Sequence, residues 1–291
     1  MLVDFIKAIV FGMIEGICEW LPISSTGHII LLGDLLSFEA VSGEGAEFAA
    51  AYSEMFDFVI QLGAIMAVVF LYFGRLNFLS RAKSRGEKRE IFSLLGRLVV
   101  ASIPAGIIFI VADKLFEVFF GCDVNEIFYN SVTVASMLVL YGILFLLAEF
   151  FTVKGEKERG IGIKEAFFIG CFQALSIIPG TSRSGSTILG ARLLGVPREK
   201  AAEFSFLLAV PAIAGASLLG SVDFISFVAE NHLRVPLALI MLLLVASFVA
   251  FLVSMATIKA LVAFVKKRSF APFGVYRIAL GVAVLLLGFG R

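Results

Sequence analysis

Acidic, basic and hydroxyl side chains are concentrated in two short runs of an otherwise apolar chain. The first polar run covers residues 15–28 and reads Glu-Gly-Ile-Cys-Glu-Trp-Leu-Pro-Ile-Ser-Ser-Thr-Gly-His. The second polar run covers residues 179–187 and reads Pro-Gly-Thr-Ser-Arg-Ser-Gly-Ser-Thr. Charged groups inside the apolar segments of a membrane protein are costly, so function is the default explanation for them. We therefore predict that the two runs together form an active site.

Glu15 and Glu19 are the acidic pair of the first run. Residues four apart on a helix project from one face, with Cβ atoms about 5–6 Å apart. Two carboxylates in a low-dielectric site repel, so one takes a proton or a cation neutralises the pair. Hard cations such as Mg²⁺ or Ca²⁺ accept oxygen ligands of this kind. The pair predicts a divalent-cation site; the alternative is a polar helix face turned to a water-filled mouth.

The same run supplies a nucleophile and a base. Ser24 and Ser25 follow Pro22, where a Ser is a good helix N-cap. His28 lies one helical turn beyond Ser25, where it could accept the Ser25 proton or bind a phosphate oxygen. The alternative is a hydrogen-bonded packing role for His28. The other histidine, His232, is expected to be solvent-exposed in an outer loop.

Arg183 lies in a turn rich in Gly, Ser and Thr that is predicted to open a helix. Unpaired N–H groups and the dipole of a helix N-terminus attract phosphate, and Arg adds a bidentate grip. The second run therefore predicts an anion site. The alternative is a structural salt bridge from Arg183 to Glu15 or Glu19, which would also bring the two runs into contact.

The composition predicts an all-α polytopic membrane protein. Of 291 residues, 60% are apolar and 16% are charged, and the mean hydropathy is +1.01. A net charge of +1 argues against nucleic acid as a partner, and the acids near the start argue against a cleaved signal peptide. At about 20 residues per crossing, six spans are predicted, near 54–73, 93–112, 128–150, 201–220, 235–258 and 270–290.

Residues 1–36 and 163–195 remain once the spans are assigned, and Pro and Gly break each of them in the middle. Non-helical backbone at membrane depth must line a cavity or be buried in protein, so both are predicted to be re-entrant helix pairs. Each pair precedes three spans, which gives two repeats, 1–150 and 151–291. At an offset of 158 residues the matched pairs are Gly12 with Gly170, Glu15 with Gln173, Ser24 with Ser182 and Gly27 with Gly185. A second match aligns 56–65 with 204–213.

Three crossings per repeat would place the second repeat upside down, with the two re-entrant tips meeting near the midplane. Loops on one predicted side hold 16 of the 24 Lys and Arg residues: 74–92, 151–164, 196–200 and 259–271. The opposite loops hold only Lys114 and Arg234. By the positive-inside rule the basic side is cytoplasmic, so both termini and the mouth of the first re-entrant pair are expected outside. The alternative, a spanning helix over 1–21, gives seven or eight crossings.

Other polar residues lie within a turn or two of a predicted span end, where snorkelling explains most of them. Asp57 and Glu54 are expected to lie near the first re-entrant pair. The full set is Glu54, Asp57, Gln61, Arg97, Glu149, Glu203 and Arg277.

A carboxylate pair, a Ser with a nearby His and an anion site at membrane depth indicate hydrolysis of a phosphorylated lipid. The two runs resemble the signatures E-G-x-x-E-[WF]-L-P-[IV]-S-S-T-G-H and P-G-x-S-R-S-G-x-T of the undecaprenyl-diphosphate phosphatases, the bacitracin-resistance protein family. The similarity extends to residues 58–63 and 203–211.

This resemblance implies a bacterial plasma-membrane enzyme that uses a divalent cation to remove the terminal phosphate of undecaprenyl diphosphate and so recycles the lipid carrier of cell-wall synthesis. The implied catalytic residues are Glu15, Glu19, Ser25, His28 and Arg183, with Glu15 and Glu19 as metal ligands. The implied substrate-binding residues are Ser24, Thr26, Gly27, Ser182, Ser184, Gly185 and Thr187.

Several alternatives stay open at this point. Ser25, His28 and a cation-activated water are all able to attack the outer phosphorus. A prenyl-phosphate flippase suits inverted repeats equally well, although transport needs no nucleophile. An intramembrane Ser–His protease has no need of Arg183. The phosphatidic-acid phosphatases use two His, and His232 is too far out to be the second. Membrane lipids are expected partners, and the oligomeric state is open.

Overall fold

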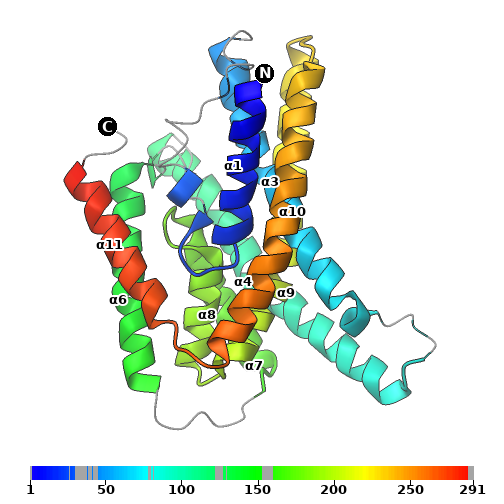
Figure 1. Cartoon of the computed structure of the whole chain (residues 1–291), viewed down its shortest axis with the longest axis vertical. Coiled ribbons are helices and arrows are strands. Elements are labelled where there is room, and N and C mark those ends of the chain that lie inside the picture. Colours follow the sequence, from blue (N-terminus) through cyan, green and yellow to red (C-terminus); the bar gives the residue numbers. More distant parts are fainter. Residues whose placement is uncertain are drawn as a thin grey trace.

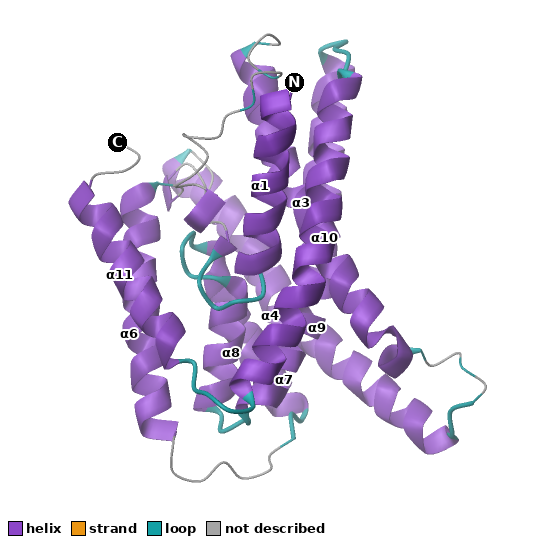
Figure 2. Cartoon of the chain, in the orientation of Figure 1, coloured by secondary structure: helices purple, strands orange, loops and turns teal. Residues whose placement is uncertain are grey.

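A computed structural model describes residues 2–25, 27–29, 38, 41, 45–77, 80, 82–121, 127–128, 130–152 and 160–287. Within these ranges every regular element is a helix (Figure 2), which confirms the predicted all-α class. In chain order the helices are α1 (Leu2–Cys18), α3 (Ala46–Leu76), α4 (Arg85–Phe120), α6 (Ser131–Thr152), α7 (Ile163–Ala174), the 3₁₀ helix η1 (Leu175–Ile177), α8 (Arg183–Leu193), α9 (Arg198–Glu230), α10 (Leu237–Val265) and α11 (Ala271–Leu287).

Five described helices are long and apolar enough to cross a membrane: α3, α4, α6, α9 and α10. They correspond to five of the six predicted spans, and most extend further because their ends carry polar residues beyond the apolar windows. The sixth predicted span, 270–290, is represented by α11, which has 17 residues; residues 288–291 lie outside the described ranges. The chain thus has the helices of a multi-pass membrane protein.

Ion pairs gather the ends of three long helices around the start of α9. Arg75 at the end of α3 pairs with Glu203 at 2.8 Å. Glu149 near the end of α6 pairs with Arg198 at 2.6 Å, and Lys266 after α10 pairs with Glu199 at 2.9 Å. Figure 1 shows the α10–α11 connection at this end as well, whereas α1 begins and α11 ends at the opposite end. The described helix ends that flank the basic loops therefore lie at one end of the molecule.

Helix α1, which carries the start of the first polar run, and helix α7, which precedes the second, are held against long helices by matched close crossings. A Cβ atom at Gly12 of α1 would collide with the backbone carbonyl of Ala246 in α10. A Cβ atom at Gly170 of α7 would collide in the same way with the backbone carbonyl of Ala101 in α4. Only Gly allows backbones to approach this closely, so these two residues set where α1 crosses α10 and where α7 crosses α4.

Snorkelling is the wrong interpretation for two of the residues near span ends. Glu149 is 5% exposed and contacts both Arg198 and Arg192. Arg277 is 0% exposed and bonds backbone carbonyls rather than reaching water. Both are held by partners inside the protein, because an unpaired charge at such a depth would be far more costly.

Candidate active site

The first polar run leaves α1 about half-way through the molecule (Figure 1). The Glu19 N–H still donates to the Glu15 carbonyl at 3.0 Å, so the two carboxylates keep the predicted helical spacing. The chain then reverses and reaches Ser24, whose φ of 75° is unusual for a residue with a side chain. The Ser24 hydroxyl accepts a hydrogen bond from the Gly27 N–H at 3.2 Å. A new helical turn therefore starts at Ser25, capped by Ser24.

The second polar run repeats this geometry. Ser182 has φ of 69°, and its hydroxyl accepts from the Gly185 N–H at 3.0 Å. Its carbonyl accepts from the Ser186 N–H at 2.8 Å. Helix α8 begins at the next residue, Arg183. The prediction that this turn opens a helix is confirmed, and Arg183 occupies the first helical position.

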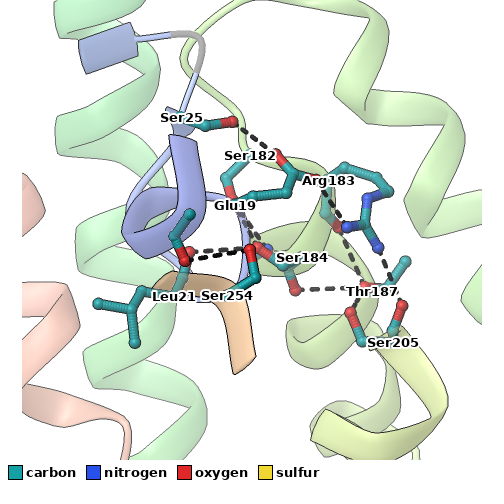
Figure 3. Close-up of polar contacts among 11 residues, drawn as sticks. Glu19, Leu21, Ser25, Ser182, Arg183, Ser184, Thr187, Ser205 and Ser254 are labelled. Atoms are coloured by element: carbon teal, nitrogen blue, oxygen red, sulfur yellow. Dashed lines mark hydrogen bonds and ion pairs between the residues drawn. The ribbon is translucent and has the colours of Figure 1, made fainter. Parts of the chain in front are cut away.

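Glu19 joins the two runs through both oxygens of its carboxylate (Figure 3). The Ser25 hydroxyl donates to Oε2 at 2.6 Å, and Nη2 of Arg183 donates to Oε1 at 2.7 Å. The other terminal nitrogen of Arg183 donates to the Ser205 carbonyl of α9 at 2.9 Å. Trp20, which is fully buried, lies 6.0 Å from the guanidinium carbon. A chain of buried hydroxyl, buried carboxylate and part-buried guanidinium results, and it confirms that the two runs are in contact.

His28 does not contact Ser25. Its Nδ1 lies 2.7 Å from the Ser24 carbonyl and its Nε2 lies 2.7 Å from the Tyr276 hydroxyl of α11. A carbonyl only accepts, so Nδ1 carries a proton in this arrangement. The Ser24 carbonyl is available because its backbone bond from the His28 N–H is long, at 3.3 Å. The hydroxyl proton of Ser25 points to Glu19, and His28 is held by α11 instead.

Glu15 is the carboxylate without a partner. It is 0% exposed, and neither of its oxygens has a hydrogen-bond partner in the part of the chain that the structure describes. A buried carboxylate in this condition calls for a cation or a proton, so its two free oxygens fit the predicted hard cation. The described residues contain no group of three or more His, Cys, Asp or Glu placed to hold a metal. The described part of the chain thus offers Glu15, with Glu19 one turn away, as the candidate ligands.

The other predicted binding residues mostly build the turns. The Ser184 hydroxyl donates to the Leu21 carbonyl at 3.2 Å and so links the second run to the first. The hydroxyl of Thr187 is buried against that of Ser205 at 2.6 Å and against carbonyls of α8. Gly185 leaves room for Arg277, because a Cβ there would lie 3.2 Å from its Nη1. Thr26 lies outside the described residues.

Three residues that contact the site were not predicted to do so: Ser205, Tyr276 and Arg277. Ser205 lies within the stretch 203–211, which was singled out by resemblance. Arg277 was visible as a charge in an apolar stretch, and that was the available signal. Nothing in the spacing of Tyr276 and Arg277 tells that α11 reaches the two runs.

Sequence comparisons agree on one family. A family model described as bacitracin resistance protein BacA matches residues 8–283. The chain is 44% identical to an undecaprenyl-diphosphatase of Desulfitobacterium hafniense in an alignment over 292 residues, and this alignment covers 98% of the chain and 96% of the relative. It is 43% identical to an undecaprenyl-diphosphatase of Streptococcus pyogenes serotype M3 in an alignment over 293 residues, which covers 99% of the chain and 98% of the relative.

Proposed function

Since the chain belongs to the bacitracin resistance protein family, we propose that it hydrolyses undecaprenyl diphosphate to undecaprenyl phosphate and inorganic phosphate. The observation that carries this proposal is the chain Ser25–Glu19–Arg183, in which one carboxylate contacts both a hydroxyl and a guanidinium at 2.6 and 2.7 Å. A nucleophile, a base and an anion-binding group are the parts that phosphoryl transfer requires. The prenyl chain of the substrate would lie in the membrane, so the diphosphate would reach the site from the bilayer.

The contacts of Ser25, Glu19 and Arg183 support the following roles in the proposed reaction. Ser25 attacks the terminal phosphorus while its proton passes to Glu19. The new Ser25 O–P bond forms as the bond from phosphorus to the bridging oxygen breaks, and the electron pair leaves with the prenyl phosphate, which takes the proton from Glu19. Water then attacks the phosphoserine and gives its proton to Glu19, which returns a proton to the Ser25 oxygen as inorganic phosphate departs. General-base assistance of this kind contributes typically about 10²–10⁴-fold.

Arg183 and the two helix N-termini would hold the diphosphate. Nε of Arg183 is buried and has no partner in the described part of the chain, so it is a donor that lacks an acceptor. Gly27 and Gly185 mark the two capped turns, whose N-terminal N–H groups favour anions. The charge that develops on the phosphoryl oxygens would thus meet donors already in place.

Glu15, with Glu19 beside it, would hold the divalent cation. When bound, the cation would supply positive charge to neutralise the phosphate oxygens. The orphaned carboxylate of Glu15 supports this assignment. His28 would orient the first run through Ser24 and Tyr276.

Two re-entrant pairs in an inverted repeat are the arrangement proposed for the chain, with repeats 1–150 and 151–291. Helices α7 and α8 have 12 and 11 residues, which at 1.5 Å per residue is about half of a ~30 Å hydrocarbon core. The matched positive φ of Ser24 and Ser182 and the matched crossings of Gly12 and Gly170 support a common ancestor element.

We also propose that the active site opens to the outer face of the plasma membrane and that both termini lie outside, because the loops that hold most of the Lys and Arg residues are predicted to share the cytoplasmic side. Single Cys probes in a background without native Cys test this orientation. Gly45→Cys and Ile225→Cys should react with an impermeant reagent from outside, and Ser84→Cys only after permeabilisation. Labelling of position 84 in intact cells would reverse the proposed orientation.

A prenyl-phosphate flippase is the second candidate, and the paired crossings α1 on α10 and α7 on α4 favour it because inverted repeats suit alternating access. Phosphate release from C55 and C15 prenyl diphosphates in detergent, with and without chelator, decides between the two. A phosphatase should release phosphate in detergent, where there is no second membrane compartment to transport the lipid into. A protein that binds the lipid but releases no phosphate would be a transporter.

A further inference from the structure

Arg277 of α11 lies beneath the site and touches both polar runs. It is 0% exposed. Nη1 donates to the Pro22 carbonyl at 3.0 Å, and Nη2 donates to the carbonyls of Gly180 at 2.7 Å and Thr181 at 3.1 Å. The guanidinium carbon also lies 5.4 Å from the centre of the Tyr141 ring in α6. The two turns, 158 residues apart, are therefore bonded to one side chain.

The carbonyls that Arg277 binds occupy matched positions. Pro22 and Gly180 align with one another at the offset that relates the two polar runs. The two terminal nitrogens of one planar group thus contact equivalent atoms of the two turns. A planar fork of donors in fixed geometry sets the spacing between its acceptors, whereas a Lys ammonium is a point charge without that geometry. The distance between the turns is therefore fixed by the guanidinium.

Stability alone does not explain a charge in this place. No carboxylate pairs with Arg277 in the described part of the chain, and its Nε has no partner. Burying a charge without a counter-ion is unfavourable, and apolar side chains of similar volume are often as stabilising. The nearest comparison is Arg192, which is 1% exposed but pairs with Glu149. Arg277 instead donates its hydrogen bonds to backbone carbonyls of the two turns.

We propose that Arg277 is a positioning residue that clamps the two turns so that the hydroxyl of Ser25 and the guanidinium of Arg183 meet on opposite oxygens of Glu19. The proposal rests on the proposed phosphatase activity for its kinetic consequence. Loss of the clamp would let the runs separate, and a misplacement of about 1 Å at a reacting centre costs on the order of 10²-fold in rate. Substrate affinity, which depends mainly on Arg183 and the helix N-termini, would change little.

Arg277→Lys tests the clamp because it keeps the charge and removes the fork. Arg192→Lys is the matched control, an equally buried Arg that bonds the Val196 carbonyl and pairs with Glu149. We expect kcat of Arg277→Lys to fall by about 10–10²-fold with KM close to that of the parent, and kcat of Arg192→Lys to stay near the parental value. Thermal unfolding of both variants in detergent reports whether each is folded. Parental kcat in folded Arg277→Lys would overturn the proposal, and a rise in KM alone would assign Arg277 to substrate attraction.

Hydrogen exchange supplies a readout that does not depend on catalysis. The Gly27 and Gly185 N–H groups are bonded within the two turns, so both should exchange faster in Arg277→Lys and not in Arg192→Lys. If the parent releases no phosphate, the proposed function fails and exchange still tests the clamp. If Arg277→Lys does not fold, Tyr141→Leu, which removes the ring beside the guanidinium, should give a smaller effect of the same kind. Unchanged exchange and kcat in the folded variant would refute the clamp.

Discussion

The first and second polar runs turn through the same backbone geometry and differ in the groups that they carry. Ser24 and Ser182 share a positive φ, and each caps the turn that follows it. The next residue is Ser25 in the first run and Arg183 in the second. Those two equivalent residues donate to the two oxygens of one carboxylate, Glu19. The same turn, present twice, thus places the Ser25 hydroxyl at one carboxylate oxygen of Glu19 and the Arg183 guanidinium at the other.

The acidic groups are not shared between the runs. Glu15 aligns with Gln173 and Glu19 aligns with Ile177. Both Glu15 and Gln173 are buried, and Glu15 Oε1 and Oε2 and Gln173 Oε1 all lack a hydrogen-bond partner in the described residues. A charged carboxylate needs a cation at that position, whereas a neutral amide does not. The two turns therefore share a backbone geometry, whereas their side chains differ, and in the proposed reaction this difference separates proton transfer from anion binding.

The largest effect is expected from Ser25→Ala. The variant removes the proposed nucleophile and keeps Arg183 and Glu19 in place, so only unassisted water attack remains and the rate should fall by more than the loss of a base would cause. Phosphate release measures the rate, and acid-quenched labelled substrate should trap an acid-stable phosphoserine in the parent alone. Ser217→Ala is the matched control, because Ser217 is equally buried and bonds the Phe58 carbonyl away from the site. A trapped phosphohistidine would instead make His28 the nucleophile.

The identity of the base gives the next largest effect. Glu19→Gln should lower kcat by about 10²–10⁴-fold, since an amide cannot accept the Ser25 proton. His28→Ala should be much milder, because His28 contacts Ser24 and Tyr276 rather than Ser25. Steady-state rates of the two variants decide the assignment. A reversed order of severity would restore the pairing of Ser25 with His28 that the sequence predicted.

That pairing shows where inference from the sequence ends. Helical spacing places His28 and Ser25 on one face, but it does not tell that the ring turns back to the Ser24 carbonyl. The contact of Arg183 with Glu19 was predictable, because two polar runs in an apolar chain are costly unless they meet. Arg277 was not, since it is far from both runs in sequence and a lone Arg near a span end usually snorkels.

The fold, too, was predictable from the sequence in one part and not in another. Apolar windows located the long helices, because a spanning helix must be continuously apolar. The turns at Ser24 and Ser182 depend on backbone conformations that no periodicity reveals.

Arg183→Lys should lower kcat by about 10²–10³-fold, as for loss of one donor to a developing oxyanion. The donors of a Lys ammonium all lie on one nitrogen, so they cannot reproduce the geometry in which separate nitrogens of Arg183 contact Glu19 and Ser205 and leave Nε for the substrate. Arg198→Lys is the control, since Arg198 is also a part-buried Arg whose guanidinium bonds a carboxylate, that of Glu149 at 2.6 Å. Phosphate release at saturating substrate measures both variants. Full activity of Arg183→Lys would reduce Arg183 to a structural ion pair.

Substitutions at the aligned positions Glu15 and Gln173 test the proposed cation site. Glu15→Gln should weaken the dependence of activity on added Mg²⁺ or Ca²⁺, because one hard oxygen ligand loses its charge. Gln173→Glu should create no such dependence of its own, since no second carboxylate of its run lies a turn away. Activity titrated against each cation after chelation measures both. If chelation leaves the parent unaffected, the cation site is wrong and the charge of Glu15 must be neutralised by a proton.

The smallest effect tests whether the two turns are equivalent. A non-Gly residue with positive φ costs on the order of 1–2 kcal/mol, and Gly removes that cost. Replacing a capping Ser by Gly costs only a few tenths of a kcal/mol, and the added freedom of the unfolded chain costs about 0.5–1 kcal/mol. Ser24→Gly and Ser182→Gly should therefore each change the free energy of unfolding by about 0 to +1 kcal/mol, and by the same amount, since their φ values are 75° and 69°.

Ser24→Ala and Ser182→Ala keep the strain and lose the cap, so each should destabilise by about 1 kcal/mol. Thermal unfolding in detergent measures all four variants. Equal shifts at the two positions would support one scaffold used twice, and a large difference between them would mean that the strain is held by the different charges around each turn.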